Sequence, residues 1–298
     1  MERTRQPIKM GKPSCILTSD WHLREDTPTC FTGDFQLEQW EAVQTIYDLQ
    51  AKYNCPILHA GDLFHHWKPS PWLLSKTIFF LPKQFYTIYG QHDLPQHNWE
   101  LRDKSGIHTL EKAGSLRVLK GCHYGQQPDM DYYAEAEITG FTKRILVWHH
   151  MAYITPPFPG ATEGMAEGIL RKYPQFNLII TGDNHQSFWT EYKGRLLVNP
   201  GNITRQSAKQ IDFKPRVYLW YAETNTVEPV YLPITEGVIS REHIDRVEER
   251  NERIQAFISK LPTEWQKGIS FEENLEIFFS QHTVRKSVKE IIYKSLEK

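Results

Sequence analysis

The sequence predicts an α/β fold, because short apolar runs are separated by longer segments and each run leads into polar residues. These runs are typical of buried parallel strands, and they read CILTS, CPILHA, FYTIY, RILVW and NLIIT. Between the first two, residues 36–53 place Leu37, Trp40, Val43 and Ile46 at helical spacing, which indicates a crossover helix. A chain of 298 residues fits one large domain with a small appendage.

The remaining elements are predicted from the same patterns. Pro71 marks the start of a second helix, and shorter helices are expected at about 107–113 and 165–173. Strands are expected at Leu116–Leu119, Tyr132–Phe141, Ile145–Trp148, Ser187–Tyr192, Arg195–Val198, Val217–Ala222 and Val227–Leu232. Turn signals separate the last four strands, so we expect antiparallel meanders that complete a sheet sandwich.

The composition shifts near residue 235, so we expect a main domain at residues 1–235 and a helical segment at residues 236–298. From Arg241 onward, eleven Lys and Arg residues are balanced by eleven Asp and Glu residues. Apolar positions three and four apart form one seam, interrupted by a single Asn, at Ile244, Val247, Asn251, Ile254, Ile258 and Leu261. The segment either packs on its own domain or docks against the helices of a partner.

Composition limits the classes of function. The formal net charge of −1 gives no general basic field for nucleic acid, although metal ions can neutralise phosphate locally. The cysteines lack a Cys-x-x-Cys pair, which favours reduced residues over a structural zinc site; they are Cys15, Cys30, Cys55 and Cys122. Residues 1–14 lack the apolar core of a signal peptide, and no apolar run reaches membrane-spanning length. We therefore expect a cytoplasmic protein with no membrane contact.

Five polar clusters follow the apolar runs, at the edge of the sheet where α/β proteins bind ligands. They are Asp20-Trp21-His22, Gly61-Asp62-Leu63-Phe64-His65, Gly90-Gln91-His92-Asp93, His149-His150 and Gly182-Asp183-Asn184-His185. Each cluster taken singly fits an ordinary turn, helix cap or core histidine. Their common position at strand ends instead predicts a hydrolytic site for two metal ions, because oxygen and nitrogen ligands without thiolates suit Mn, Fe or Zn.

A dinuclear site needs one carboxylate that bridges both ions, and Asp62 is the best candidate. We expect Asp20, His22 and His185 to complete the ligands of one ion. The second ion would take Gln91, His149 and Asp183. We favour His149 over His150 because it follows the strand directly.

His92 is the predicted catalytic imidazole. Asp93 follows it, and we expect this carboxylate to accept a hydrogen bond from the His92 ring and fix its tautomer. His92 would then stabilise the charged transition state or protonate the leaving oxygen, while a metal-bound hydroxide attacks the phosphodiester. No side-chain nucleophile is required.

The clusters resemble the motifs of the calcineurin-like metallophosphoesterase superfamily: Asp-x-His, Gly-Asp-x-x-(Asp/His), Gly-Asn-His-(Asp/Glu), His and Gly-His-x-His. The resemblance implies a four-layer α/β/β/α sandwich, two Mn, Fe or Zn ions, and the ligand roles given above. Two residues depart from the pattern, since Gln91 replaces Asn and Asp183 replaces His. Because a carboxylate is a harder ligand than imidazole, we expect Mn²⁺ to serve better than Zn²⁺, with Mg²⁺ or Fe also possible.

Residues 61–71 and the turn at 198–202 resemble the SbcD and meiotic-recombination-11 DNA repair nucleases. In those nucleases a histidine at the position of His65 is tied to exonuclease action, which implies a DNA exo- and endonuclease; the alternative for His65 is a purely supporting role. The resemblance also implies an SbcC-type coiled-coil ATPase partner bound through the C-terminal helices, and a homodimer. The alternatives are a cyclic-nucleotide or small phosphodiester hydrolase, a phosphoprotein phosphatase, or an inactive scaffold.

Side chains near the motifs suggest contacts with DNA. Aromatic residues that could stack on unpaired bases, or else pack in the core or rim, are Trp21, Trp67, Trp99 and Tyr153. Basic residues that could follow the backbone, or else only face solvent, are Arg24, Lys68, Arg144 and Arg205. The loop Ile154–Gly164, with Tyr153 and Phe158, either walls the site or is an ordinary connection.

Overall fold

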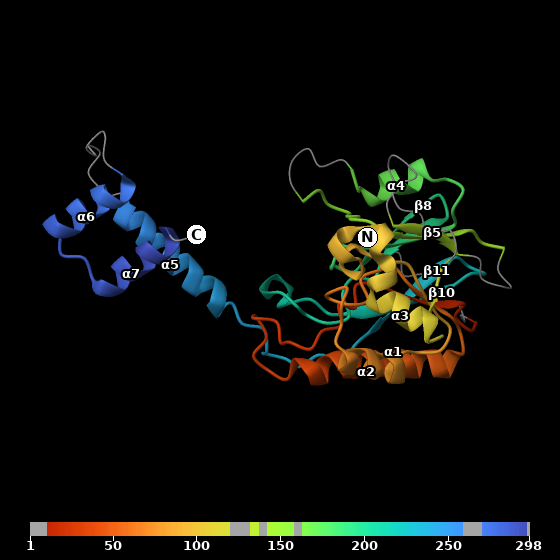
Figure 1. The fold of residues 1–298 in the computed structure, drawn as a ribbon. Coiled ribbons are helices and arrows are strands. Elements are labelled where there is room, and N and C mark those ends of the chain that lie inside the picture. Colours follow the sequence, from red (N-terminus) through yellow and green to blue (C-terminus); the bar gives the residue numbers. More distant parts are fainter. Residues whose placement is uncertain (1–10, 120–131, 137–141, 158–162, 259–269, 297–298) are drawn as a thin grey trace. The chain divides into compact units, whose positions relative to one another are not determined.

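A computed structural model describes residues 11–119, 132–136, 142–157, 163–258 and 270–296 (Figure 1). The chain forms two compact units, Met1–Ser240 and Arg241–Lys298. Several predicted features lie outside the described residues: Cys122, Phe158, Leu261 and the strand positions 137–141. The first unit has the predicted mixed α/β fold.

The first unit contains a six-stranded sheet and a five-stranded sheet. In the six-stranded sheet, four neighbouring strands run parallel: β1 (Cys15–Thr18), β2 (Ile57–His59), β3 (Phe85–Thr87) and β4 (Arg117–Val118). In the five-stranded sheet the central strands β6 (Ile145–His149), β7 (Leu178–Gly182) and β9 (Arg195–Asn199) are parallel. Its edges are the antiparallel strands β5 (Tyr133–Ala136) and β8 (Phe188–Tyr192).

The last four strands form two hairpins in different sheets. Strands β8 and β9 complete the five-stranded sheet, whereas β10 (Arg216–Tyr221) and β11 (Thr226–Tyr231) extend the six-stranded sheet beside β1. The chain therefore crosses from one sheet to the other between β9 and β10. The last four predicted strands are present, and their two antiparallel pairs complete different sheets of the sandwich.

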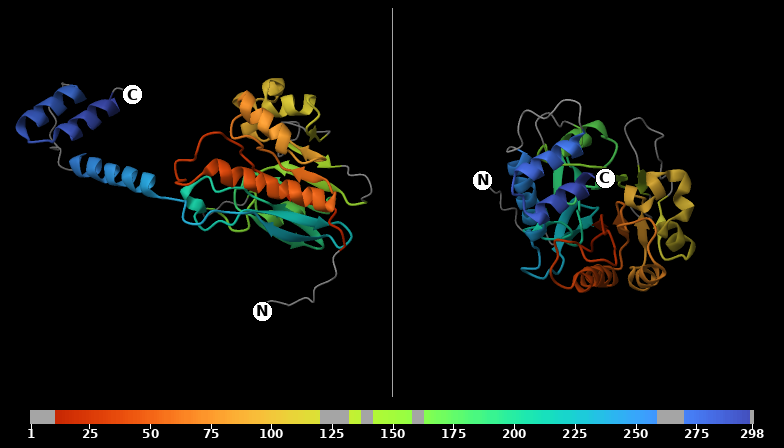
Figure 2. Two further views of the ribbon diagram at one scale, coloured as in Figure 1. Left: turned by 90° about the horizontal axis from the view of Figure 1, so that it is seen from below. Right: turned by 60° about the vertical axis from the view of Figure 1, so that its left-hand side comes forward.

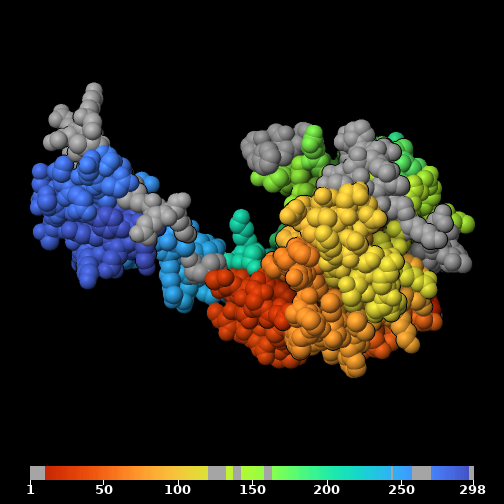
Figure 3. Space-filling model, viewed as in Figure 1, coloured from red at the N-terminus to blue at the C-terminus, as the bar shows by residue number. Residues whose placement is uncertain are grey.

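Three hydrophobic clusters show that the first unit has the predicted four-layer α/β/β/α arrangement. One cluster joins the six-stranded sheet to α1 (Phe35–Tyr53), α2 (Pro71–Phe80) and α3 (Gly106–Lys112). A second lies between the sheets, and a third joins the five-stranded sheet to α4 (Ala166–Lys172). The right-hand view of Figure 2 shows α1 and α2 on one side of this sandwich and α4 on the other. The segments containing α2 (orange) and α3 (yellow) form one continuous surface in Figure 3.

The helix starts follow from local capping. Asp34 caps α1 by accepting a hydrogen bond from the backbone N–H of Leu37 at 3.0 Å. Ser70 caps α2 by accepting from the N–H of Leu73 at 3.1 Å, and Pro71 occupies the first helical turn. The prediction that Pro71 begins a helix is therefore confirmed.

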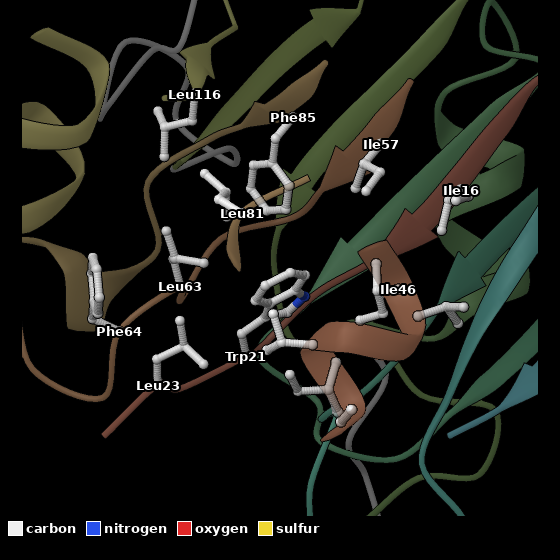
Figure 4. Close-up of a cluster of buried hydrophobic side chains, with 14 of the residues drawn as sticks. Ile16, Trp21, Leu23, Ile46, Ile57, Leu63, Phe64, Leu81, Phe85 and Leu116 are labelled. Carbon is white, nitrogen blue, oxygen red and sulfur yellow. The ribbon is translucent and has the colours of Figure 1, made fainter. Parts of the chain in front are cut away.

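Trp21 belongs to the core, which is the alternative to base stacking that the sequence left open for it. Its side chain is fully buried among Leu23, Leu63 and Phe85 (Figure 4). The ring packs edge-on against Phe85, and its Nε1–H donates to Thr18 Oγ1 at 2.8 Å. Because Trp21 separates Asp20 from His22, its burial anchors the first polar cluster to the sheet.

The second unit consists of α5 (Glu242–Ile258), α6 (Phe271–Gln281) and α7 (Lys286–Leu296), as the sequence predicts. Helices α6 and α7 pack through a small core of Leu275, Phe278, Phe279 and Ile292. On the predicted seam of α5, Ile244 and Ile254 are partly buried while Val247 is exposed.

Two further observations concern the described residues only. None of their helices combines the length and the apolar character needed to cross a membrane. The cysteines among them, Cys15, Cys30 and Cys55, are free and buried.

Candidate metal centre

The five polar clusters come together because their strands end side by side. The parallel register aligns Thr18 with His59, and His59 with Thr87, so β1, β2 and β3 end at one level. In the other sheet, His149 pairs with Gly182 at the end of β6 and β7. The site therefore lies at the carboxyl edge of both sheets, as predicted.

Four of the predicted ligand residues have left-handed backbones. The φ angles are 49° at Asp20, 43° at His22, 57° at Asp62 and 73° at Asp183. Such conformations are uncommon outside glycine and cost free energy, so they persist where surrounding contacts enforce them. Their concentration at one edge indicates that the turns are shaped to aim these side chains.

Asp62 lies at the middle of the site. Its Oδ2 atom is 3.5 Å from His22 Nε2 and 3.3 Å from His149 Nε2. Its Oδ1 atom accepts a hydrogen bond from the backbone N–H of His92 at 2.9 Å. A Cβ atom on Gly90 would lie 2.1 Å from this oxygen, so only glycine leaves room for it. One Asp62 carboxylate thus faces ligands from both sheets, the position that a bridging group requires.

The ligands predicted for the first ion lie together. Asp20, His22 and His185 offer atoms that are all within 4.8 Å of one another. The two Nε2 atoms of His22 and His185 are 3.2 Å apart. Asp20 belongs equally to a second group with Asp62 and His149, so this carboxylate reaches both halves of the site.

Gln91 and Asp183, predicted for the second ion, contact each other. The Gln91 Nε2 amide donates to Asp183 Oδ1 at 2.6 Å. The backbone N–H of Asp183 donates to Asp20 Oδ1 at 3.0 Å, which ties the two sheets together. The two residues that depart from the family pattern are therefore partners, and the longer Gln91 side chain reaches the carboxylate that replaces the usual histidine.

The structure places His149, and not His150, against Asp62. The Nδ1 atom of His149 lies 2.7 Å from the backbone carbonyl of Ala60, which accepts its proton and leaves Nε2 facing Asp62. Gly61 and Gly182 flank this ring so closely that a Cβ on either would approach Nδ1 within 2.7 Å. The His150 ring instead stacks on Trp148, with centroids 3.9 Å apart.

The expected bond between Asp93 and the His92 ring is not formed. Asp93 is buried and accepts backbone hydrogen bonds from Asp62 at 2.8 Å, Gly90 at 3.0 Å and Phe64 at 3.2 Å. The turn at Gly90 directs this carboxylate back toward the 61–64 loop. The ring of His92 is instead fixed through Nδ1, which lies 3.0 Å from the backbone carbonyl of His65. Asp93 therefore shapes the loop that carries Asp62, and a main-chain oxygen sets the His92 tautomer.

His65 joins the site through its ring. A nitrogen atom from each of His22, His65 and His92 lies within 4.8 Å of the other two. The rings of His65 and His92 are stacked, with centroids 5.7 Å apart. Burial, the charge of Arg24 and the nearby His92 lower the pKa of His65 to about 4, so its ring is neutral at physiological pH.

Buried charges in the site are unbalanced within the protein. Burial raises the pKa of Asp20 to about 7. Although burial opposes it, the Asp62 carboxylate raises the pKa of His149 to about 10. Burial also raises the pKa of Asp62, but His149 and His22 outweigh it and hold that pKa below its ordinary value. A divalent cation would supply the missing positive charge and favour ionised carboxylates with neutral imidazoles.

Atoms without hydrogen-bond partners identify where cations fit. Of the nine such buried side-chain atoms among the described residues, four belong to the site: Asp20 Oδ2, His22 Nδ1, Asp62 Oδ2 and His149 Nε2. A buried polar atom left unpaired costs about 1–3 kcal/mol. Asp20, Asp62 and His149, which hold three of these atoms, also form one group of possible metal ligands, and the Nε2 atoms of His22 and His185 lie beside it, so the residues fit a pair of divalent cations.

Two basic residues predicted to follow DNA are placed elsewhere. Arg205 is fully buried, and its Nη2 donates to Glu38 Oε2 at 3.2 Å and to the carbonyl of Thr235. Arg144 precedes β6, at the opposite end of that strand from His149, and pairs with Glu135 at 2.9 Å. Neither guanidinium group lies at the metal edge: Arg144 faces solvent, which was the alternative for it, whereas Arg205 lies in the core, which was not expected.

Two residues that support the site were not predicted. Asn199 Nδ2 donates to the carbonyls of Asn184 and Gln186 at 2.6 and 2.7 Å, and so holds the loop that carries His185. His59 lies in the core, with Nδ1 2.8 Å from Thr87 Oγ1. The Pro200-Gly201 turn directly after Asn199 could have indicated a structural role for Asn199. His59 lies within an apolar run, and the sequence gives no separate sign of its role.

Comparison with known proteins identifies the family of the chain. A model of the calcineurin-like phosphoesterase superfamily domain matches residues 15–217. A search of curated proteins found no match. Similar solved structures include a novel archaeal phosphodiesterase, with 14% identity over 73% of this chain and 99% of that chain and a TM-score of 0.43.

Two others are vacuolar protein sorting 29 from Cryptosporidium parvum and a predicted phosphoesterase from Streptococcus pneumoniae. The first has 14% identity over 74% of this chain and 97% of that chain, with a TM-score of 0.33. The second has 14% identity over 74% and 99%, with a TM-score of 0.32. Because the family model spans most of the chain and includes every residue of the metal centre, the chain belongs to the calcineurin-like phosphoesterase superfamily.

Proposed function

We propose that the chain is a DNA phosphodiesterase of the SbcD type, with exonuclease and endonuclease action. The observation that carries this proposal is the position of His65, whose ring lies beside His22 and His92 in the site. In the SbcD and meiotic-recombination-11 nucleases, which residues 61–71 resemble, a histidine at this position is tied to exonuclease action.

The protein residues have distinct roles in the proposed reaction. Two bound cations would supply Lewis-acid chemistry and lower the pKa of water. Asp62 holds the two halves of the site at a fixed separation. The Nδ1–H of His92 donates to the His65 carbonyl, and Nε2 is free to face the departing oxygen; the imidazolium form of His92, which carries a proton on both nitrogens, would donate the Nε2 proton to that oxygen and remain as the neutral ring. Asp93 keeps the Asp62 loop in place through backbone hydrogen bonds.

The metal is proposed to be Mn²⁺. Three of the seven predicted ligands are carboxylates and one is an amide: Asp20, Asp62, Asp183 and Gln91. Oxygen-rich sites suit Mn²⁺ and Mg²⁺, whereas imidazole-rich sites favour Zn²⁺. After removal of metal by a chelator, Mn²⁺ should restore more activity than Zn²⁺ alone.

The direct test is hydrolysis of end-labelled duplex and single-stranded DNA with Mn²⁺, beside bis-p-nitrophenyl phosphate and cyclic nucleotides. Cleavage of DNA, absent in the Asp62→Asn protein, supports the proposal. Hydrolysis of cyclic nucleotides or the small diester without cleavage of either DNA would establish another phosphodiesterase instead. If none of these substrates is hydrolysed with Mn²⁺, the remaining alternative is an inactive scaffold.

His65→Ser is expected to reduce the rates of both reactions unequally. The loss in exonucleolytic trimming of DNA should be at least about tenfold larger than the loss in cleavage of bis-p-nitrophenyl phosphate. The ring lies beside the catalytic histidine, where it can orient a nucleotide end that the small diester lacks. The measurement is the ratio of the two rates in wild-type and variant protein. His66→Ser, which alters the exposed neighbouring residue, is the matched control. Equal losses on both substrates would remove the special role of His65.

The partners stay predictions. An SbcC-type coiled-coil ATPase would dock on the C-terminal unit, where α5 carries the partly exposed seam of Ile244, Val247 and Ile254. A homodimer is the other prediction. Sedimentation analysis of the full chain, alone and with the candidate ATPase, tests both.

A further inference from the structure

Arg24 is held beside His65 by the backbone. Leu23 forms a parallel bridge with Phe64, and the N–H of His65 donates to the carbonyl of Leu23 at 3.1 Å. The residues that follow this bridge on each segment are Arg24 and His65, so the register makes them neighbours. Consistent with this, the Arg24 charge is one of the causes that lower the pKa of His65, after burial.

Helix α1 fixes the main chain at Arg24 with three side-chain hydrogen bonds. The N–H of Arg24 donates to Gln39 Oε1 at 3.0 Å. Its carbonyl accepts from Gln36 Nε2 at 2.8 Å and from Gln39 Nε2 at 3.1 Å. Gln39 is itself completely buried. A loop residue with this support is positioned as firmly as a residue within a helix or strand.

The guanidinium group of Arg24 has an exchangeable partner. Its side chain is only 14% exposed, and it pairs with Asp26 through two bonds, with Nε 3.0 Å from Oδ1 and Nη2 on Oδ2. The Asp26 side chain is 69% exposed, so solvent and ligands can compete with it for the N–H groups of the Arg24 guanidinium. A phosphate group offers the same pair of oxygens to a guanidinium fork as a carboxylate does.

We propose that Arg24 is a phosphate-binding residue, whose guanidinium leaves Asp26 to hold a backbone phosphate of the nucleic acid next to the diester being cleaved. The inference rests on the proposed function, since it adds a second phosphate site to the same substrate. Before the substrate binds, Asp26 would hold the Arg24 guanidinium in position and balance its positive charge. A small diester has no second phosphate and gains little from this contact.

Kinetics with Mn²⁺ and a DNA oligonucleotide test the assignment. Arg24→Gln should raise KM for the oligonucleotide about tenfold, the size of one lost charged hydrogen bond. Its kcat should change less, and KM for bis-p-nitrophenyl phosphate should rise much less. Asp26→Asn should lower KM for the oligonucleotide, because it weakens the competitor. Opposite effects from the two variants exclude misfolding as the cause.

The matched control is Arg144→Gln. Like Arg24, Arg144 pairs with a carboxylate. Its partner is Glu135, and the pair is exposed at the end of the five-stranded sheet that lies away from the site. Its substitution should leave KM for the oligonucleotide at the wild-type value. Equal weakening by Arg24→Gln and Arg144→Gln would overturn the inference, because it would show only a general charge effect.

Binding measurements separate this inference from the proposed nuclease activity. The His92→Ala protein with Mn²⁺ should bind a fluorescent oligonucleotide with little cleavage. Adding Arg24→Gln should weaken binding and reduce the slope of log affinity against log salt by about 1. Unchanged affinity and slope would overturn the role of Arg24. A wild-type protein that hydrolyses only small diesters would reject the nuclease function, and the binding result would still decide on Arg24.

Discussion

Asp62→Asn should abolish Mn²⁺-dependent hydrolysis and lower the bound metal. Asp62 Oδ2 lies between His22 Nε2 and His149 Nε2, so this oxygen is shared by ligands from the two sheets. Asn keeps the shape and retains an acceptor for the His92 N–H, but it removes the negative charge that holds two cations near each other. Because loss of a mere supporting hydrogen bond to a ligand costs about 10–100-fold, loss of the bridge should cost more than about 100-fold.

The measurement is kcat beside the number of metal ions bound per chain. Asp103→Asn is a suitable control, because Asp103 is exposed on the 3₁₀ helix Trp99–Lys104, outside the set of ligands. Its activity and metal content should match the wild type. Full metal content and activity within tenfold of wild type in Asp62→Asn would contradict the bridging role.

His92→Ala should lower kcat by about 10²–10⁴-fold while the metal content stays near the wild-type value. The backbone N–H of His92, which binds Asp62 Oδ1 at 2.9 Å, is kept in the variant. Only the imidazole is lost, together with its ability to donate a proton to the leaving oxygen. The expected combination is therefore slow turnover on an intact metal centre.

A substrate series adds a specific test of proton donation. If His92 protonates the leaving oxygen, the variant should lose least with diesters whose leaving groups are good, such as p-nitrophenolate, and most with alkoxide leaving groups. The exposed His97 provides the control substitution His97→Ala. A uniform loss across leaving groups, or loss of metal from the variant, would argue against His92 as the proton donor.

The sequence was sufficient for the architecture, and it identified polar residues that lie close together in the structure. Apolar runs such as RILVW are typical of buried parallel strands, and the polar residues that follow such strands collect at the carboxyl edge. This reasoning placed His149 and Asp62 at a common edge, and the structure adds that they belong to different sheets. His149 was favoured over His150 only because it directly follows the apolar run, and the structure places His149 against Asp62 and the His150 ring against Trp148.

The directions of individual side chains could not be predicted. Trp21 lies between two residues with left-handed backbones, Asp20 and His22, and that turn sends its ring into the core. Asp93 was expected to contact the adjacent His92 ring, yet the turn at Gly90 delivers its carboxylate to main-chain groups of residues 62–64. Arg205 contacts Glu38, which is far away in the sequence. Such contacts depend on how segments far apart in the sequence pack together, so the local sequence pattern does not predict them.

The division of the ligands between two sheets makes the metal centre sensitive to shear within the sandwich. Asp20, His22 and Asp62 follow strands of one sheet, while His149 and His185 follow strands of the other. Any sliding of one layer over its neighbour would change the spacing of the cations, and a misplacement of about 1 Å can cost about 100-fold in rate. The apolar side chains packed between the two sheets therefore help to set the spacing of the metal ligands, although they are not ligands themselves.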